Sequence, residues 1–145
     1  MFTITYPATF EKTSDSRVLV RFPDFGWGVT DGADREEAFS EAQDCLRTII
    51  ATHMTNGEKV PVPSRPARGQ RLVPVPLDLA PKLALYLAIT EKGLTVSKFA
   101  KKMGLKESDV TKMLDPRKPC RLDLLSEALG CFGKQLTVSI DDAVS

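Results

Sequence analysis

Basic side chains between positions 92 and 121 are the feature most able to do chemistry in this sequence. Nine lysines and arginines stand there against three aspartates and glutamates, a net charge of plus six. Such a concentration of positive charge indicates a polyanionic partner, although a basic run is often only a solvated face. The side chains that we expect to contact DNA are Lys98, Lys101, Lys102, Lys106, Glu107, Ser108, Thr111, Lys112, Arg117 and Lys118.

Apolar residues within positions 94–132 supply a framework for these side chains. Their helical spacing predicts two short helices, a tight turn and a third helix. Gly104 stands where the turn needs a positive φ, and Ala100 leaves room for the second helix to cross closely. Pro116 ends the second helix. With Val110 and Met113, this register resembles the phage-repressor type of helix-turn-helix, whose second helix enters the DNA major groove. The alternative is an ordinary three-helix packing unit.

The helix-turn-helix register divides the predicted DNA contacts into two kinds. Ser108, Thr111 and Lys112 fall on the exposed face of the second helix, where they can reach base edges. Glu107 either accepts a hydrogen bond from cytosine or, as we favour, only complements the helix dipole. The side chains that suit phosphate contacts are Lys98, Lys101, Lys102, Arg117 and Lys118.

The first half of the chain predicts a sheet covered by one helix. Strand patterns occupy residues 2–6, ended by Pro7, then residues 17–22 and 27–30, with a hairpin loop over 11–16. Asp34 is the expected cap of an amphipathic helix of about four turns. Asn56 and Gly57 are expected to end that helix. Three strands and a helix predict a small α+β domain.

Prolines and arginines fill the segment that follows. We interpret residues 65–77 as an extended linker, in which residues 72–75 add an edge strand to the first domain. A further helix is expected over 79–92, and Leu122, Leu125 and Leu129 predict another after the helix-turn-helix. Residues 135–140 alternate like a strand that has no local partner. Pairing with a second copy would satisfy its backbone, and a homodimer or higher homo-oligomer is also what a helix-turn-helix needs.

Composition narrows the class of protein. The chain has 145 residues, 42% hydrophobic and 27% charged, which is typical of globular proteins, and no apolar run nears the ~18 residues that cross a bilayer. We see no secretory signal and expect a cytoplasmic protein, whose three cysteines stay reduced thiols. Residues 1–70 carry a net charge of minus two and the remainder plus three. This charge asymmetry indicates two separate functions, and we expect the second half to bind nucleic acid.

Enzymatic chemistry finds little support. The single histidine, His53, lies near the end of the predicted helix with no activated serine or cysteine nearby. Asp15, Asp24, Asp31 and Asp34 could serve a metal-dependent nuclease, but they fall in loops rather than on adjacent strands. We therefore expect no catalytic residues, no metal site and no cofactor.

Short motifs along nearly the whole chain resemble the HicB antitoxin family of bacterial toxin–antitoxin modules. They are Tyr6-Pro7, Val20-Arg21-Phe22-Pro23-Asp24, Thr30-Asp31-Gly32-Ala33-Asp34, Glu37-Ala38-Phe39-Ser40-Glu41-Ala42, Val60-Pro61-Val62-Pro63-Ser64 and Val73-Pro74-Val75-Pro76. Each motif is weak alone, and their order and spacing carry the resemblance.

The resemblance implies an N-terminal truncated RNase H-like domain that inhibits a HicA-type toxin, and a C-terminal domain that binds the operator of its own operon. A toxin that grips RNA is basic, so an acidic N-terminal half would complement it. We expect toxin contacts from Asp24, Phe25, Trp27, Asp31 and Asp34 around the glycine-containing turn. Alternatively, Phe25 and Trp27 only cap the core; Trp27 stands where the family usually has a small or cysteine-type residue.

The expected organisation has three parts: residues 1–64 for toxin binding, 65–77 as linker and edge strand, and 78–145 for DNA binding and dimerisation. The expected function is that of an antitoxin that also represses its own operon by binding operator DNA. The alternative is a free-standing transcriptional repressor whose N-terminal domain senses a ligand or assembles subunits. A neighbouring reading frame for a small basic protein with a catalytic histidine would favour the antitoxin.

Overall fold

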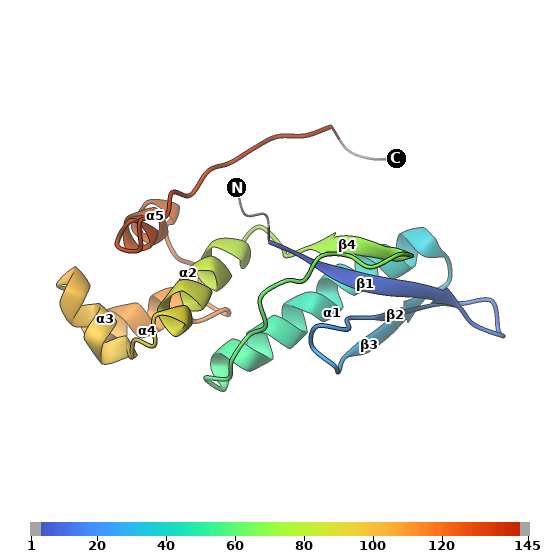
Figure 1. Cartoon of the computed structure of the whole chain (residues 1–145), viewed down its shortest axis with the longest axis horizontal. Helices are drawn as coiled ribbons and strands as arrows, with labels where there is room; N and C mark the ends of the chain where they lie inside the picture. Colours follow the sequence, from blue (N-terminus) through green and yellow to red (C-terminus); the bar gives the residue numbers. More distant parts are fainter. Residues whose placement is uncertain (1–3, 143–145) are drawn as a thin grey trace.

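The computed structural model describes residues 4–142 and belongs to the α+β class, with a four-stranded antiparallel sheet and five helices. The sheet and the longest helix form one end of an elongated molecule, and four shorter helices form the other (Figure 1). The first end contains β1 (Thr5–Lys12), β2 (Val18–Arg21), β3 (Val29–Gly32), α1 (Arg35–Thr55) and β4 (Gln70–Pro74). The second contains α2 (Ala80–Glu91), α3 (Val96–Met103), α4 (Glu107–Leu114) and α5 (Leu122–Gly130).

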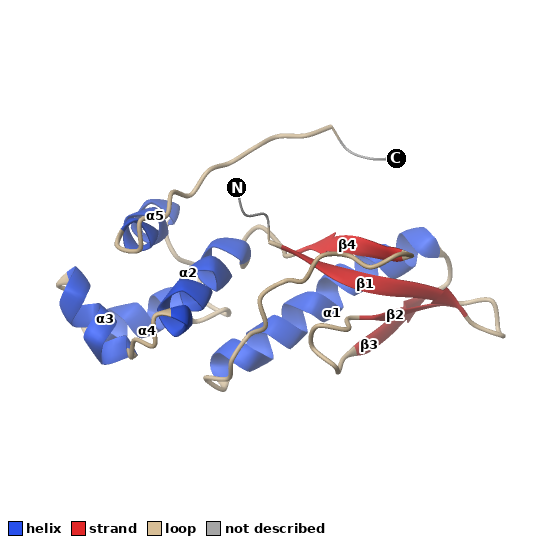
Figure 2. Cartoon of the chain, viewed as in Figure 1, coloured by secondary structure: helices blue, strands red, loops and turns tan. Residues whose placement is uncertain are grey.

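The strands lie in the order β3-β2-β1-β4, and α1 packs across one face of the sheet (Figure 2). The edge strand expected over 72–75 is present as β4, which pairs Val73 with Tyr6 of β1. The prediction that Pro7 ends the first strand was wrong, because β1 continues to Lys12. Since β2 pairs only with residues 9–12 of β1, the missing N–H of Pro7 faces no strand on that side. Phe2 and Thr3 of the expected first strand lie outside the described residues.

The long helix α1 begins and ends where the sequence predicts. The Asp34 carboxylate accepts a hydrogen bond from the backbone N–H of Glu37 at 2.8 Å, which satisfies one of the free donors of the first turn. Gly57, at φ 68°, follows the last turn. The helix spans 21 residues, longer than the predicted four turns. Gly32 lets β3 approach this helix, because a Cβ there would collide with the backbone of Ala38.

Two hydrophobic cores meet at α2. Leu79, at its start, and Leu83 belong to the core under the sheet, whereas Leu85 and Ile89 belong to the core of the C-terminal helices. The Tyr86 hydroxyl also donates a hydrogen bond to the carbonyl of Glu58 at 2.6 Å. The helix expected to open the second domain therefore packs against both halves of the molecule.

The short strand predicted over 135–140 does not form within one chain, and its pairing with a second copy stays a prediction. Residues 134–142 form neither helix nor strand, and the tail runs away from α5 (Figure 1). Val138 is 84% exposed and Ile140 is 95% exposed. A strand needs a neighbouring backbone for its hydrogen bonds, and none of the sheet strands lies beside this segment.

Candidate functional site

The turn after β2 is folded tightly by its backbone. The N–H groups of Phe25 and Gly26 both donate to the carbonyl of Phe22, at 3.2 and 3.3 Å. Gly28 has a φ of 86°, and a Cβ there would collide with the Ile49 side chain of α1. Glycine is therefore required where the chain crosses α1, and this crossing places Trp27 over the C-terminal part of that helix.

Three aromatic rings gather at this turn. The Phe25 ring packs 4.8 Å from Tyr6 and 5.6 Å from His53, measured between ring centroids. The Trp27 ring lies 5.8 Å from His53, and its Nε1–H donates to His53 Nε2 at 3.0 Å. His53 Nδ1 faces Glu58 Oε2 at 3.4 Å. Phe25 therefore packs on the core, as the alternative interpretation predicts, while Trp27 remains 45% exposed, and a toxin contact by either residue stays a prediction.

A pocket of about 580 Å³ opens beside these rings. Its walls include Phe25, His53 and Val62, and Val62 is 66% exposed. We call the surface formed by Phe25, Trp27, His53 and Val62 the aromatic patch. Exposed apolar side chains next to a concavity are typical of surfaces that bind proteins.

The carboxylates predicted for this site are held by other residues of the chain. Asp24 accepts hydrogen bonds from the backbone N–H and the hydroxyl of Ser64, at 2.9 and 2.7 Å. Asp31 forms an ion pair with Arg17 at 2.6 Å, and Asp34 caps α1. Asp24 therefore stabilises the turn, whereas Asp31 and Asp34 lie at the other end of the β2–β3 pair, beside the start of α1. Within residues 4–142, none of the three joins a cluster of metal-ligating side chains.

Sequence reasoning missed His53 and Val62 as members of this surface. His53 lies four residues after Ile49, so it falls on the same face of α1 as a buried residue that touches the turn. That spacing was the signal that could have found it. Val62 lies in the extended segment after α1, and nothing in its local sequence indicates that this segment returns to the turn.

The α3–α4 pair has the geometry that the sequence predicts. Thr95 caps α3 by accepting from the N–H of Lys98 at 3.1 Å. Gly104 takes the left-handed conformation, with φ 71°, and Ala100 is buried at the crossing of the helices. Val110 and Met113 of α4 are also buried in the core that includes Ala100. The apolar residues face inward, which leaves the polar face of α4 to the solvent.

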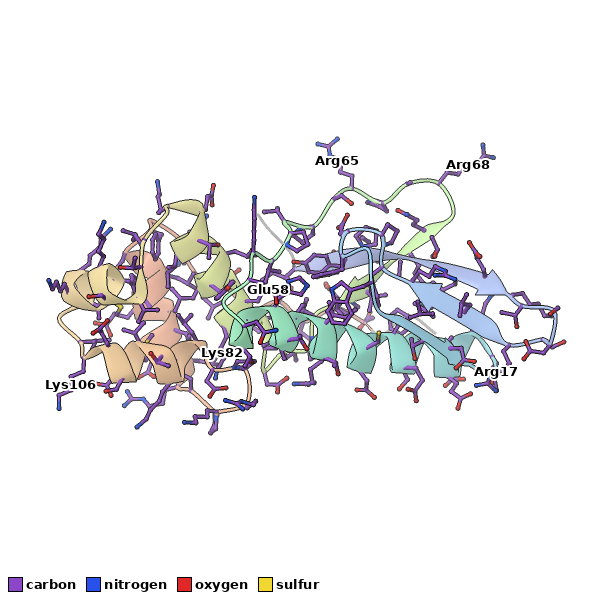
Figure 3. The ribbon with its side chains drawn as sticks, turned by 90° about the horizontal axis from the view of Figure 1, so that it is seen from below. Arg17, Glu58, Arg65, Arg68, Lys82 and Lys106 are labelled. Atoms are coloured by element: carbon purple, nitrogen blue, oxygen red, sulfur yellow. The ribbon has the colours of Figure 1, made fainter. Side chains whose placement is uncertain are left out.

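All ten side chains predicted to contact DNA lie on the exposed surface of this half. Lys106 projects from the outer end of the molecule (Figure 3). Within residues 4–142, no lysine forms an ion pair with a carboxylate, so these charges remain available. Arg117 is instead bound to Asp115 at 3.1 Å, which holds the pKa of that carboxyl below its usual range. Among the described residues, the lysines around α3 and α4 therefore have no carboxylate partner, whereas Arg117 after them is paired with Asp115.

Comparison with known proteins places this architecture in a family. Residues 5–84, from β1 into α2, match the family described as HicB_like antitoxin of bacterial toxin-antitoxin system. Antitoxin HicB 1 of Photorhabdus laumondii is 36% identical over 136 residues, which cover 94% of this chain and 86% of that protein. The chain belongs to the HicB-like antitoxin family. Antitoxin HicB of Escherichia coli K12 is 26% identical over 133 residues, covering 92% of this chain and 96% of that protein.

Membership in the HicB-like family defines the role of this chain in outline. It supports an antitoxin role, and a toxin is the partner that such a role implies. Proteins of this kind are regulators rather than enzymes, which confirms the prediction of a non-enzymatic protein. The matched segment contains the aromatic patch and ends before α3, while the curated relatives extend over both halves. Among the described helices, none is both long and apolar enough to cross a membrane.

Proposed function

We propose that this HicB-like antitoxin neutralises a HicA-type, RNA-cleaving toxin through its N-terminal half and represses its own operon through its C-terminal half. In this proposal, residues 1–64 form a truncated RNase H-like, toxin-binding domain, residues 65–77 join it to the rest, and residues 78–145 form a helix-turn-helix and dimerisation domain. The observation that carries the proposal is that one chain presents an exposed aromatic patch at one end and free lysines at the other.

The aromatic patch supports the toxin contact. Trp27 offers a large apolar surface that is already held in place by its hydrogen bond to His53, so little conformational entropy is lost when a partner covers it. Asp24 and Phe25 then act mostly by holding the turn in the shape that the toxin contacts, whereas Asp31 and Asp34 act by stabilising β3 and the start of α1. The net charge of minus two over residues 1–70 favours encounter with a basic, RNA-binding protein.

The α3–α4 pair supports operator binding. Ser108, Thr111 and Lys112 lie on the exposed face of α4, which is the second helix of the proposed helix-turn-helix. Thr111 donates its hydroxyl proton to the carbonyl of Glu107 at 2.9 Å, and its oxygen keeps acceptor capacity for a base. The phosphate contacts are proposed for Lys98, Lys101, Lys102, Lys106, Arg117 and Lys118, and Glu107 is assigned to the N-terminal dipole of α4.

The C-terminal tail supports assembly into a dimer. Leu136, Val138 and Ile140 alternate with polar residues, and the last two are almost fully exposed. We propose that the tails of two copies pair as strands, which supplies the backbone hydrogen bonds that one chain cannot provide. Two helix-turn-helix units in one dimer would then read two half-sites of the operator.

Co-expression with the neighbouring reading frame tests both halves of the proposal. We expect the full chain to co-purify with a small basic toxin, to rescue cells that produce it, and to shift a fragment of its own promoter in a mobility-shift assay. Rescue without promoter binding would remove the repressor role. Promoter binding without rescue or co-purification would instead establish a free-standing repressor.

A further inference from the structure

Lys82 is a buried lysine with no role in either proposed surface. It lies on the first turn of α2, only 2% of its surface is exposed, and Leu83 of one core and Leu85 of the other follow it in the same helix. Its Nζ donates to the backbone carbonyl of Asp115 at 2.5 Å and to the backbone carbonyl of Lys118. Figure 3 shows Lys82 where the two halves of the molecule meet, far from Lys106 at the outer end.

The two carbonyls that Lys82 contacts bracket the loop after α4. Within this loop the N–H of Lys118 donates to the carbonyl of Asp115 at 3.2 Å, and the N–H of Arg117 donates to the Asp115 carboxylate at 2.9 Å. Pro116 and Pro119 have no N–H, so the loop has few donors of its own. The ammonium group supplies donors at the C-terminal end of α4, where a positive charge is also favoured by the helix dipole.

The helix that carries Lys82, α2, is itself bound to the N-terminal half. Leu83, the next residue of α2, is buried under the sheet, and Tyr86 reaches the carbonyl of Glu58 one turn later. Arg47 of α1 binds Asp78, just before α2, through two hydrogen bonds of 2.7 and 2.8 Å. Through these contacts α2 is held to the N-terminal half, so a segment bound to α2 keeps a fixed position relative to the aromatic patch.

We propose that Lys82 is a positioning residue for DNA binding: it fixes the end of α4 and the loop carrying Arg117 and Lys118 to α2. The orientation of the DNA-binding surface relative to the toxin-binding half then depends on this one ammonium group. This inference rests on the proposed operator binding. Because its side chain is buried, Lys82 touches no phosphate itself and acts through the two residues that it positions.

A buried ammonium group is a costly way to fill this space. Burial lowers the pKa of Lys82, and the nearby Asp115 and Asp78 carboxylates and the Cys120 thiol oppose that shift. Methionine has a similar length and no charge to desolvate, so it should fill the space with little loss of stability. A purely structural role and a positioning role therefore predict different results for this substitution.

The test compares Lys82→Met with Lys92→Met in the full chain. Lys92 is the exposed C-cap residue of the same helix, so its substitution removes the same charge without touching the loop. Binding to a duplex of the natural promoter is titrated at several salt concentrations. The fluorescence of Trp27, the single tryptophan, reports whether the N-terminal half stays folded in each variant.

We expect Lys82→Met to weaken operator binding about tenfold and to flatten the salt dependence, because each lost phosphate contact removes about 0.9 from the slope. Lys92→Met should keep both the affinity and the slope close to those of the wild type. The thermal unfolding midpoint of Lys82→Met should stay within a few degrees of the wild type. A loss of affinity at an unchanged salt slope would mean that Lys82 only stabilises the fold, and would overturn the proposal.

A further variant covers the case in which Lys82→Met does not fold. Lys82→Gln places its donor one bond nearer the backbone than the lysine Nζ, so it cannot hold both loop carbonyls as lysine does, and it should give a salt slope between those of the wild type and a chain lacking Arg117 and Lys118 contacts. A wild-type slope in Lys82→Gln would then overturn the positioning role. If the wild type itself shows no preference for its promoter, the proposed operator binding fails, and the role of Lys82 fails with it.

Discussion

The two ends of the molecule use charge in opposite ways. In the N-terminal half, the carboxylates of Asp24 and Asp31 are bound by Ser64 and Arg17, and apolar surface at the turn after β2 is left exposed. Around α4, the apolar residues are buried and the lysines are left without carboxylate partners in the described chain. An exposed aromatic ring contributes most binding free energy when another protein removes it from water, whereas unpaired lysines contribute most when they bind a polyanion. This difference favours a protein as the partner of the sheet-bearing end and a polyanion as the partner of the helical end.

The largest effect that would break this comparison comes from Trp27→Ala. We expect a loss of about 2–4 kcal/mol in toxin affinity, because an exposed, pre-positioned tryptophan at an interface centre is a typical hot spot. Isothermal titration of the purified toxin into each variant measures it. Operator binding should not change, since Trp27 lies between β2 and β3, in the half that carries the sheet.

Leu72→Ala is the matched control for Trp27→Ala. Leu72 is also an exposed apolar residue of the N-terminal half, but it lies on the edge strand β4 rather than beside the pocket. If Leu72→Ala loses as much toxin affinity as Trp27→Ala, or more, the toxin covers the free sheet face or the β4 edge and the aromatic patch is not its main contact.

At the other end, Lys112→Ala should weaken operator binding by about 1–3 kcal/mol, since a lysine on the second helix can bind a guanine edge. A titration at fixed salt measures this loss, and toxin binding should stay constant. Lys134→Ala is the control, because Lys134 is equally exposed but follows α5. If both variants lose the same affinity, Lys112 contributes only through its positive charge and makes no specific contact with a base.

A smaller effect is expected at α2, the helix that packs against both ends of the molecule. Tyr86→Phe removes the hydrogen bond to the carbonyl of Glu58, and we expect it to cost about 1 kcal/mol of unfolding free energy. Urea denaturation measures the loss. An unchanged unfolding free energy would show that the two ends are joined by packing on α2, which belongs to both cores, rather than by this hydrogen bond.

Tyr86 also predicts a pH dependence. Burial raises its pKa, and the negative charge of Glu58 adds to the shift; burial raises the pKa of Tyr6 as well. The folded chain therefore keeps phenol protons that the unfolded chain loses near pH 10. Unfolding free energy should fall as the pH rises above about 10, and Tyr86→Phe should make that fall shallower. An identical slope in both proteins would contradict this account of Tyr86.

The contrast between the ends also explains what the sequence could predict. Local signals were sufficient for α1, whose cap Asp34 and terminal Gly57 lie next to it, and for the turn at Gly104. Local signals failed where the secondary structure depends on residues far away in the sequence or in another copy. The strand predicted over 135–140 has the right alternation but no partner within one copy, and Pro7 is tolerated in β1 because of where β2 begins pairing.

The candidate sites follow the same rule. The exposed polar face of α4 was predictable because helical spacing alone separates Val110 and Met113 from Ser108 and Lys112. The aromatic patch was only half predictable. Trp27 and Phe25 are visible in the turn, but His53 and Val62 reach them from segments about 26 and 35 residues further along, through tertiary packing that a local pattern does not encode.

The smallest effect concerns the ion pair between Arg47 of α1 and Asp78 before α2. The pair is bidentate but partly exposed, so Asp78→Asn should lower the unfolding free energy by no more than about 1 kcal/mol. Arg47 holds the pKa of Asp78 below its usual value, so this contribution is present above about pH 4 and is lost as the pH falls further. A double-mutant cycle with Arg47→Gln, measured by urea denaturation at pH 7 and pH 3, isolates the pair. A coupling that persists unchanged at pH 3 would contradict the assignment of this contribution to the ionised carboxylate of Asp78.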